Sequence, residues 1–257
     1  MIIDAHVHIT KDGKWFDTGH DASLKKLIES LDKNKIDKAI LLPIVPYISN
    51  EYILKVCNEY PEKFIGFCSV NPLKRNAAKD LEHYVIDYGL KGLKLHPKLQ
   101  GFFSYDNSIS KVIMKATELK IPVLIDAWVK PNEINSSNII DLIETIAQDH
   151  PSCKIILPHF GGYSYKKMPE ISNKFNNIAF DLSYVLSKFD GDVLHEEIIP
   201  IIRQIDCKKL IFGSDFPEID ISQYLKKAKQ VFTDMHYSSK DLDAVFSKNI
   251  RNLLQIG

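Results

Sequence analysis

The feature that most restricts the fold of this chain is a regular alternation of short apolar runs with longer amphipathic segments. Eight runs rich in branched and aromatic residues recur: MIIDAHVHI, DKAILLP, KFIGFCSV, LKGLKLH, IPVLIDAW, CKIILPHF, NIAFDLS and KLIFGSDF. Runs of this length and composition predict β-strands. Eight strands that alternate with helices predict a parallel sheet with crossover helices.

The segments between these runs carry apolar residues at helical spacing. Residues 21–35 place four aliphatic side chains on one stripe, and Asp21 is the expected N-cap. Further helices are predicted at 50–60, 76–89, 107–120, 136–149, 192–203, 221–233 and 239–254. Ser239 is the expected N-cap of the last one.

Length and strand count distinguish two α/β architectures. A (β/α)8 barrel typically takes about 250 residues, and the chain has 257. An open doubly wound sheet requires a glycine-rich phosphate loop after its first strand, and the segment HITKDGKWF is not one. No low-complexity linker or composition break divides the sequence. We therefore expect an α/β fold, a (β/α)8 TIM barrel, with residues 1–257 forming a single domain.

Charge and hydropathy narrow the class of partner. A formal net charge of zero argues against binding to nucleic acid or to a membrane surface, both of which require a basic patch. No apolar run approaches the roughly 20 residues that span a bilayer, and the N-terminus does not resemble a signal peptide. Four cysteines without a CxxC pair indicate reduced thiols. We expect a cytoplasmic protein that binds a small-molecule substrate.

Polar side chains end most of the predicted strands. Side chains alternate along a strand, so His6 and His8 share one face, with Asp4 two residues behind them. The polar strand ends are His6, His8, Lys94, His96, Asp126, His159, Asp181, Ser183 and Asp215. Barrel enzymes carry their active sites at the carboxyl ends of the strands. We therefore expect these side chains to surround one site.

Several ionisable groups around one buried axis require pairing or a bound cation, because burying charge is costly. Two histidines and one or two carboxylates, with a position left for water, are a common catalytic zinc set. Thiolates are absent from the set, so manganese and iron also suit it. We expect a divalent metal, with Zn2+ the first choice and Mn2+ or Fe2+ as alternatives.

Five segments are spread along the whole chain, in this order from the N-terminus: DAHVH, GLKLHP, LPHFGG, FGSDFP and KNIRNLL. Together they resemble the amidohydrolase superfamily, and most closely its amidohydrolase-related branch of metal-dependent TIM-barrel hydrolases and decarboxylases. The resemblance implies that His6 and His8 bind the metal. It also implies that Asp215 binds metal or takes a proton from water, and that His159 acts as an acid or base near the substrate.

The fifth strand departs from the family pattern. The resemblance implies a metal-binding histidine in a PVLIH-like segment, but this chain reads PVLIDAW, which puts Asp126 in that place. A carboxylate is itself a zinc ligand, at about 2.0–2.2 Å, so Asp126 is a candidate ligand. Alternatively the metal is lost and the remaining groups bind substrate directly. We favour retention, because His6, His8 and Asp215 are intact.

Three further residues are expected to bind substrate. Lys94 is either a carbamylated bridge in a two-metal site or a lysine that fills the barrel or binds an anion. His96 either reaches the substrate or ends its strand. Trp128 belongs to a group of aromatic residues that follow strands and can form an apolar wall. The group is Trp15, Phe16, Phe102, Phe103, Trp128, Tyr163 and Tyr165.

Three functions remain open. The first is a metal-dependent hydrolase, in which Asp215 or His159 takes a proton as an activated water attacks an ester, lactone or amide. The second is a lyase with the same site, a metal-dependent non-oxidative decarboxylase of an aromatic or unsaturated acid. The third is a metal-free or non-catalytic binding barrel. A homodimer is the default expectation, because members of the resembling families often pair through barrel helices.

Overall fold

The predicted apolar runs form the parallel strands of a barrel. In the computed structural model, which describes residues 1–130, 138–189 and 191–257, every predicted run contains a strand. The strands are β1 (Ile3–Val7), β2 (Lys38–Leu41), β3 (Phe64–Gly66), β4 (Cys68–Ser69), β5 (Leu93–Leu95), β6 (Val123–Ile125), β7 (Ile155–Leu157), β8 (Ile178–Asp181) and β9 (Leu210–Ile211). They pair in parallel in the orders β1-β2-β3 and β4-β5-β6-β7-β8-β9.

The first seam between these two sheets lies at Phe67, the one residue that separates β3 from β4. The Phe67 N–H donates to the backbone oxygen of Leu41 in β2 at 3.1 Å. The next N–H, of Cys68, donates to the oxygen of Gly92 beside β5 at 2.8 Å. The chain thus moves from one neighbour to the other, and β3 and β4 are two halves of one barrel strand.

The second seam lies between β9 and β1. The Ala5 N–H donates to the backbone oxygen of Phe212 at 3.0 Å, and the Asp215 N–H donates to that of His6 at 2.9 Å. These bonds carry the pairing from the last strand to the first. The predicted (β/α)8 TIM-barrel fold is confirmed, and the second seam already places Asp215 beside His6.

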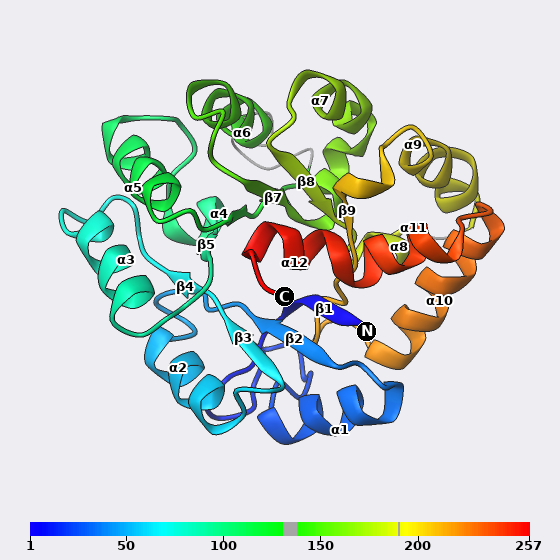
Figure 1. Ribbon diagram of the computed structural model, residues 1–257, viewed down its shortest axis with the longest axis horizontal. Coiled ribbons are helices and arrows are strands. Elements are labelled where there is room, and N and C mark those ends of the chain that lie inside the picture. Colours follow the sequence, from blue (N-terminus) through cyan, green and yellow to red (C-terminus); the bar gives the residue numbers. More distant parts are fainter. Residues whose placement is uncertain (131–137, 190) are drawn as a thin grey trace.

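Helices surround the strands on the outside of the ring (Figure 1). The α-helices are α1 (Leu24–Asn34), α2 (Asn50–Glu59), α3 (Ala77–Ile86), α4 (Pro97–Gln100), α5 (Asn107–Glu118), α6 (Asn138–Asp149), α7 (Met168–Lys174), α8 (Val185–Lys188), α9 (Ile199–Ile202), α10 (Ile221–Asp234), α11 (Ser239–Asp243) and α12 (Asn249–Leu254). The 3-10 segments are η1 (Pro158–Lys167) and η3 (Cys207–Lys209), and the π-helices are η2 (Val193–Ile198) and η4 (Ala244–Lys248). The first two residues predicted for the helix at 136–149 lie outside the described residues. Within the described chain, no helix is long and apolar enough to cross a membrane.

Two helices begin at other caps than expected. The Ser23 side chain, rather than that of Asp21, caps α1, while Asp21 Oδ1 accepts from the Ser23 N–H at 2.8 Å. Ser238, rather than Ser239, caps α11 and forms a capping box with Asp241. In this box the Asp241 N–H donates to Oγ of Ser238, and the Ser238 N–H donates to the Asp241 carboxylate, so two backbone N–H groups are satisfied. These bonds favour Ser238 over Ser239 as the cap.

An apolar cluster fills the inside of the barrel. Its buried members are Ile3, Ala5, Ile40, Leu42, Phe67, Leu124, Ile156, Ala179, Ile211, Ile250 and Leu254. The last two come from α12, which crosses the end of the barrel where the two termini lie (Figure 1). A second and larger cluster packs between the strands and the outer helices. With one end closed by α12, the polar strand ends gather at the opposite end.

The register of β1 shifts between Asp4 and Val7. Ala5 belongs to the inner apolar cluster, whereas Val7 belongs to the outer one. The simple alternation is therefore broken by one residue, as at a β-bulge. His6 and His8 do share the inner face as predicted, but Asp4 does not stand behind them on that face.

Candidate metal centre and active site

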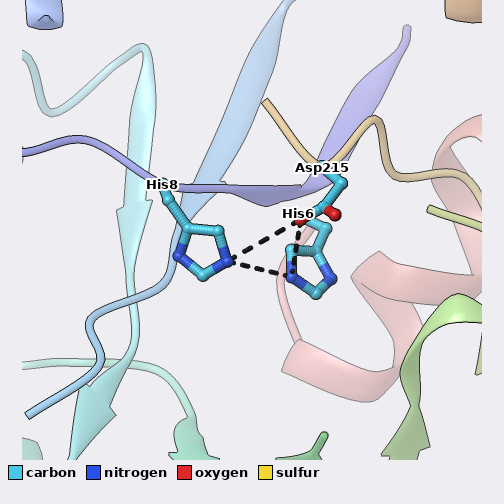
Figure 2. Close-up of side chains that lie close together, drawn as sticks. All are labelled: His6, His8 and Asp215. Carbon is cyan, nitrogen blue, oxygen red and sulfur yellow. Dashed lines mark hydrogen bonds and ion pairs between the residues drawn. The ribbon is translucent and has the colours of Figure 1, made fainter. Parts of the chain in front are cut away.

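Three acceptor atoms converge at the carboxyl ends of β1 and β9 (Figure 2). Nε2 of His6 lies 3.1 Å from Nε2 of His8. Oδ1 of Asp215 lies 3.5 Å from the first nitrogen and 3.8 Å from the second. All three side chains are buried. In the part of the chain that the structure describes, this is the group of His, Cys, Asp or Glu side chains with metal-ligand spacing.

The other nitrogen of each imidazole is held by an acceptor. Nδ1 of His6 donates to Oδ2 of Asp181 at 2.6 Å, and Nδ1 of His8 donates to the backbone oxygen of Leu42 at 2.7 Å. Burial holds the pKa of both histidines well below the ordinary value, so both rings are neutral at pH 7. A neutral imidazole with its proton on Nδ1 presents a lone pair at Nε2.

The donor set of this cluster fits a divalent cation. Two imidazole lone pairs and a carboxylate oxygen face one another, and like partial charges at this spacing repel unless a cation lies between them. Acceptors on the outer nitrogens are also the usual surroundings of metal-binding histidines. Two imidazoles and one carboxylate suit zinc, manganese and iron(II).

Asp126 is not brought into this three-residue cluster. Its Oδ2 lies 3.3 Å from Nε2 of His159 and 3.4 Å from Nζ of Lys94, and its Oδ1 lies 3.8 Å from Nε2 of His96. Burial by itself raises the pKa of Asp126, but the facing His96, Lys94 and His159 hold it well below the ordinary value. Asp126 is therefore an ionised carboxylate among basic side chains. We call the three basic residues Lys94, His96 and His159, together with the Asp126 that they surround, the basic cluster.

His159 connects the basic cluster with the histidines of β1. It lies in η1 directly after β7 with a φ of 56°, a conformation that non-glycine residues seldom adopt and that often occurs at functional sites. Its ring centroid is 4.9 Å from that of His6. Burial lowers the pKa of His159, but the charges of Asp215 and Asp126 outweigh it and raise the pKa to about 9. His159 is thus protonated at neutral pH.

Ser183 lies between the same two histidines. Its Oγ is 3.2 Å from Nδ1 of His6 and 3.0 Å from Nδ1 of His159, and it donates to Oδ2 of Asp181 at 3.1 Å. The sequence placed Asp181 and Ser183 at a strand end but assigned them no role. Their strand-end position was a signal of proximity to the site, whereas their hydrogen bonds depend on the tertiary structure.

Asp215 follows β9 and complements His159. Burial raises the pKa of Asp215 to about 6, against the opposing effect of the charges of His159 and Lys94. The carboxylate is therefore ionised at pH 7 and lies beside both Nε2 atoms. One buried site thus combines an ionised carboxylate that can accept a proton with an imidazolium that can donate one.

A cavity of about 360 Å³ opens onto these groups. Seven of the eight predicted site residues line it, namely His8, Lys94, His96, Asp126, Trp128, His159 and Asp215. His6, which is fully buried, is the predicted site residue that does not line it. Of the predicted aromatic wall, Trp15, Phe16 and Trp128 line the cavity, joined by Tyr184, while Phe102 is buried in the outer core.

A larger cavity, of about 560 Å³, lies at the other end of the barrel, near the start of β8 and the helix α12. Lysines and asparagines line much of it, and none of the predicted site residues does. Cys207, Lys209 and Asp241 in its lining also have displaced pKa values. The smaller cavity is the candidate active site, because His8 and Asp215 of the metal-ligand cluster line it together with Asp126 and His159.

The family model described as Amidohydrolase matches residues 3–256 of the chain. The chain belongs to the amidohydrolase family. The resemblance inferred from its sequence segments is thus confirmed, and the family is metal-dependent. A comparison with curated protein sequences finds no match.

Three solved structures illustrate the shared fold. An uncharacterized TIM-barrel protein from Bordetella bronchiseptica has a TM-score of 0.83 at 16% identity, over 99% of this chain and 98% of that chain. A probable 2-pyrone-4,6-dicarboxylic acid hydrolase from Acinetobacter baumannii has a TM-score of 0.73 at 18% identity, over 99% of each chain. The 5-carboxyvanillate decarboxylase of Sphingomonas paucimobilis has a TM-score of 0.70 at 14% identity, over 100% of this chain and 99% of that chain.

Proposed function

We propose that this amidohydrolase is a metal-dependent hydrolase that acts on a small ester, lactone or amide bearing a carboxylate. The observation that carries the proposal is that Asp215 lies 3.5 Å from Nε2 of His6 and 3.8 Å from Nε2 of His8, and shares its cavity with His159. Burial raises the pKa of Asp215 to about 6, and the charges of Asp215 and Asp126 raise that of His159 to about 9. Between these values the carboxylate is ionised and the imidazole is protonated. Hydrolysis requires one group of each kind, and enzymes obtain them by displacing two pKa values in one site.

The roles of the residues follow from their positions. His6, His8 and Asp215 would hold the cation, Zn2+ first and Mn2+ or Fe2+ as alternatives. When bound, that cation supplies an acidified water and polarises the substrate carbonyl. Asp215 accepts the proton of the attacking water, because it lies beside both Nε2 atoms. His159 donates a proton to the leaving group from its position at the cavity wall.

The basic cluster supports an anionic substrate. Lys94 is buried, with its Nζ 3.4 Å from Asp126, and both it and His96 line the cavity. Trp128 and Tyr184, with ring centroids 4.9 Å apart and planes 78° apart, offer an apolar wall for a ring or an acyl chain. In this proposal Asp126 orients Lys94 and His159 rather than acting as a fourth ligand. The Acinetobacter structure, named for a dicarboxylic acid and solved with citric acid bound, agrees with this class of substrate.

Non-oxidative decarboxylation of an aromatic or unsaturated acid is the second candidate. It is favoured by a buried, protonated His159 that faces a cavity with aromatic walls, because such a group can deliver a proton to carbon. The Sphingomonas decarboxylase shares the fold. A non-catalytic barrel is the least favoured function, because it gives no reason for opposed pKa shifts in one cavity.

The deciding experiment uses the purified protein loaded with Zn2+ or Mn2+, in water enriched in oxygen-18. Lactones, esters and amides with a carboxylate are screened beside aromatic and unsaturated carboxylic acids. One heavy oxygen in the product acid identifies hydrolysis, whereas release of carbon dioxide identifies decarboxylation. His8→Ala and Asp215→Asn should abolish turnover, and His195→Ala, on an exposed position, should not. No turnover with any substrate or metal would favour the binding barrel.

A further inference from the structure

The indole of Trp15 stacks on the imidazole of His8. The two ring centroids are 5.0 Å apart and the planes differ by 22°. Trp15 lies in the loop after β1, yet it is only 5% exposed. Its Nε1–H donates to Oε1 of Glu218, a residue of the loop after β9. A side chain of the loop after β1 therefore covers one face of the His8 imidazole, and a side chain of the loop after β9 holds it there.

The loop that carries Trp15 is held at both of its ends and in its middle. The Thr10 N–H donates to the backbone oxygen of Ala22 at 3.0 Å, which joins the two ends. Glu218 contacts the loop a second time, since its Oε2 lies 3.8 Å from Nε2 of His20. One carboxylate thus fixes the loop at two points, and the indole is placed by these contacts.

The stacking restrains His8 where its own hydrogen bond does not. The bond from Nδ1 to the oxygen of Leu42 fixes one point of the ring, which can still turn about that point. An indole lying nearly parallel to the ring blocks this rotation. Nε2 of His8 then stays aimed at Nε2 of His6 and at Asp215.

The same contact favours the cation-bound state. An imidazole that shares its lone pair with a cation becomes electron-poor, and the face of an indole attracts positive charge. The stack is therefore stronger with a cation at Nε2 than without one. It also keeps water away from one side of His8, which strengthens electrostatic interactions at the cluster.

We propose that Trp15 is a positioning residue for the metal ligand His8, and that Glu218 keeps Trp15 in place. This inference rests on the proposed metal site, and it predicts that removing the indole weakens cation binding without removing any ligand. Groups that orient a metal-binding histidine typically change metal affinity by about 10- to 100-fold.

The test measures the dissociation constant for Zn2+ by competition with a chromophoric chelator. Trp15→Leu should weaken binding by about 10- to 100-fold. Trp15→Phe, which keeps a flat ring but loses the N–H, should lose less. Glu218→Ala should follow Trp15→Leu in direction, whereas Glu218→Gln, which keeps an oxygen acceptor for the indole, should bind as the wild type does. Tyr47→Leu changes an exposed aromatic side chain near the same mouth and should have no effect.

A second readout is spectroscopic. The chain has two tryptophans, so in a Trp128→Phe background the emission comes from Trp15 alone. Titration with Co2+ should quench it at one equivalent. A wild-type protein that binds no stoichiometric cation would overturn the proposed metal site itself. Unchanged affinity in folded Trp15→Leu would overturn the role of Trp15 while leaving the metal site in place. Equal affinities in Glu218→Gln and Glu218→Ala would overturn the role of the Glu218 hydrogen bond.

Discussion

Nδ1 of His6 lies 2.6 Å from Oδ2 of Asp181, although 175 positions separate the two residues in the sequence. Burial raises the pKa of Asp181 to about 6, so the carboxylate is ionised at pH 7 and accepts the imidazole proton. That proton stays on Nδ1, and the lone pair of Nε2 faces His8 and Asp215. Asp181, at the end of β8, therefore determines which nitrogen of His6 is free to bind a cation.

Asp181→Asn should weaken cation binding by about 10- to 100-fold. The Asp181 side chain accepts from three donors, since Oδ1 binds the Ser183 N–H at 2.7 Å and Oδ2 binds both His6 and the Ser183 hydroxyl. An asparagine has one oxygen, so its amide NH2 would face His6 and drive the imidazole proton to Nε2. Competition with a chelator measures the loss, and Asp192→Asn, at an exposed position, is the matched control. Equal affinities in the two variants would refute this role of Asp181.

Removal of the cation should lower the thermal stability of the protein. A ligand that binds only the folded state, at a free concentration 1,000 times its dissociation constant, stabilises that state by about 4.1 kcal/mol. Differential scanning calorimetry with Zn2+ and with a chelator should therefore give two separate melting temperatures. The difference should vanish in His6→Ala/His8→Ala. If it persists there, the cation stabilises the protein from another site.

Most of the fold was predictable from the sequence, because parallel barrel strands are buried on both faces and read as continuous apolar runs. Contacts between side chains of different loops were not predictable. Trp15 was visible as an aromatic residue after a strand, but nothing in the local pattern links it to Glu218, which lies 203 positions away. Helix starts shifted by one or two residues, because the capping bond of Ser238 depends on Asp241 rather than on periodicity.

The sequence predicted which residues lie near the candidate site better than it predicted how those residues are arranged. Strand ends meet at one end of a barrel whatever their sequence, so the eight residues were brought together. Asp126 lies with Lys94 and His159 rather than with His6 and His8. This placement depends on distances across the barrel and on the charges of Lys94 and His159. The shift of register in β1 that moves Asp4 off the inner face leaves no mark in an alternating sequence.

The pH dependence of kcat/KM should be bell-shaped. Activity falls at low pH as Asp215, with a pKa of about 6, gains a proton, and a cation beside it shifts this limb to lower pH by favouring the carboxylate. Activity falls at high pH as His159, with a pKa of about 9, loses its proton, and a cation that offsets the charge of Asp215 moves this limb to lower pH as well. In Asp126→Asn a charge that raises the pKa of His159 is gone, so the alkaline limb should move to lower pH. An alkaline limb that does not move would contradict the role of His159 as the acid.

Asp126→Ala should destabilise the fold by about 3–5 kcal/mol, because it leaves the ammonium group of Lys94 buried without its carboxylate. Lys94→Met should cost less, since Asp126 keeps His96 and His159 as partners. The double variant Lys94→Met/Asp126→Ala should be more stable than Asp126→Ala alone. Urea unfolding of all four proteins completes the cycle. Additive effects would show that the two side chains are not coupled.

Gly213→Ala should damage the metal centre more than the fold. A Cβ at this position would lie 2.7 Å from Oδ1 of Asp181 and 2.8 Å from Cβ of His6, and neither neighbour can move freely, because each is hydrogen-bonded on both sides. Displacing His6 and Asp181 should weaken cation binding by at least about tenfold, as expected when a group that orients a metal ligand is disturbed. Overpacking costs about 1–3 kcal/mol of stability.

Gly92→Ala is the matched control for this prediction. Its Cβ would lie 2.4 Å from the ring of Phe67, inside the barrel and away from the ligands. It should therefore destabilise the metal-free protein by a similar amount but leave the affinity for Zn2+ unchanged. Urea unfolding and chelator competition on both variants separate the two effects. If both glycine variants lose cation affinity equally, the loss reflects general strain in the barrel, and the close approach of Gly213 to His6 and Asp181 has no special part in forming the site.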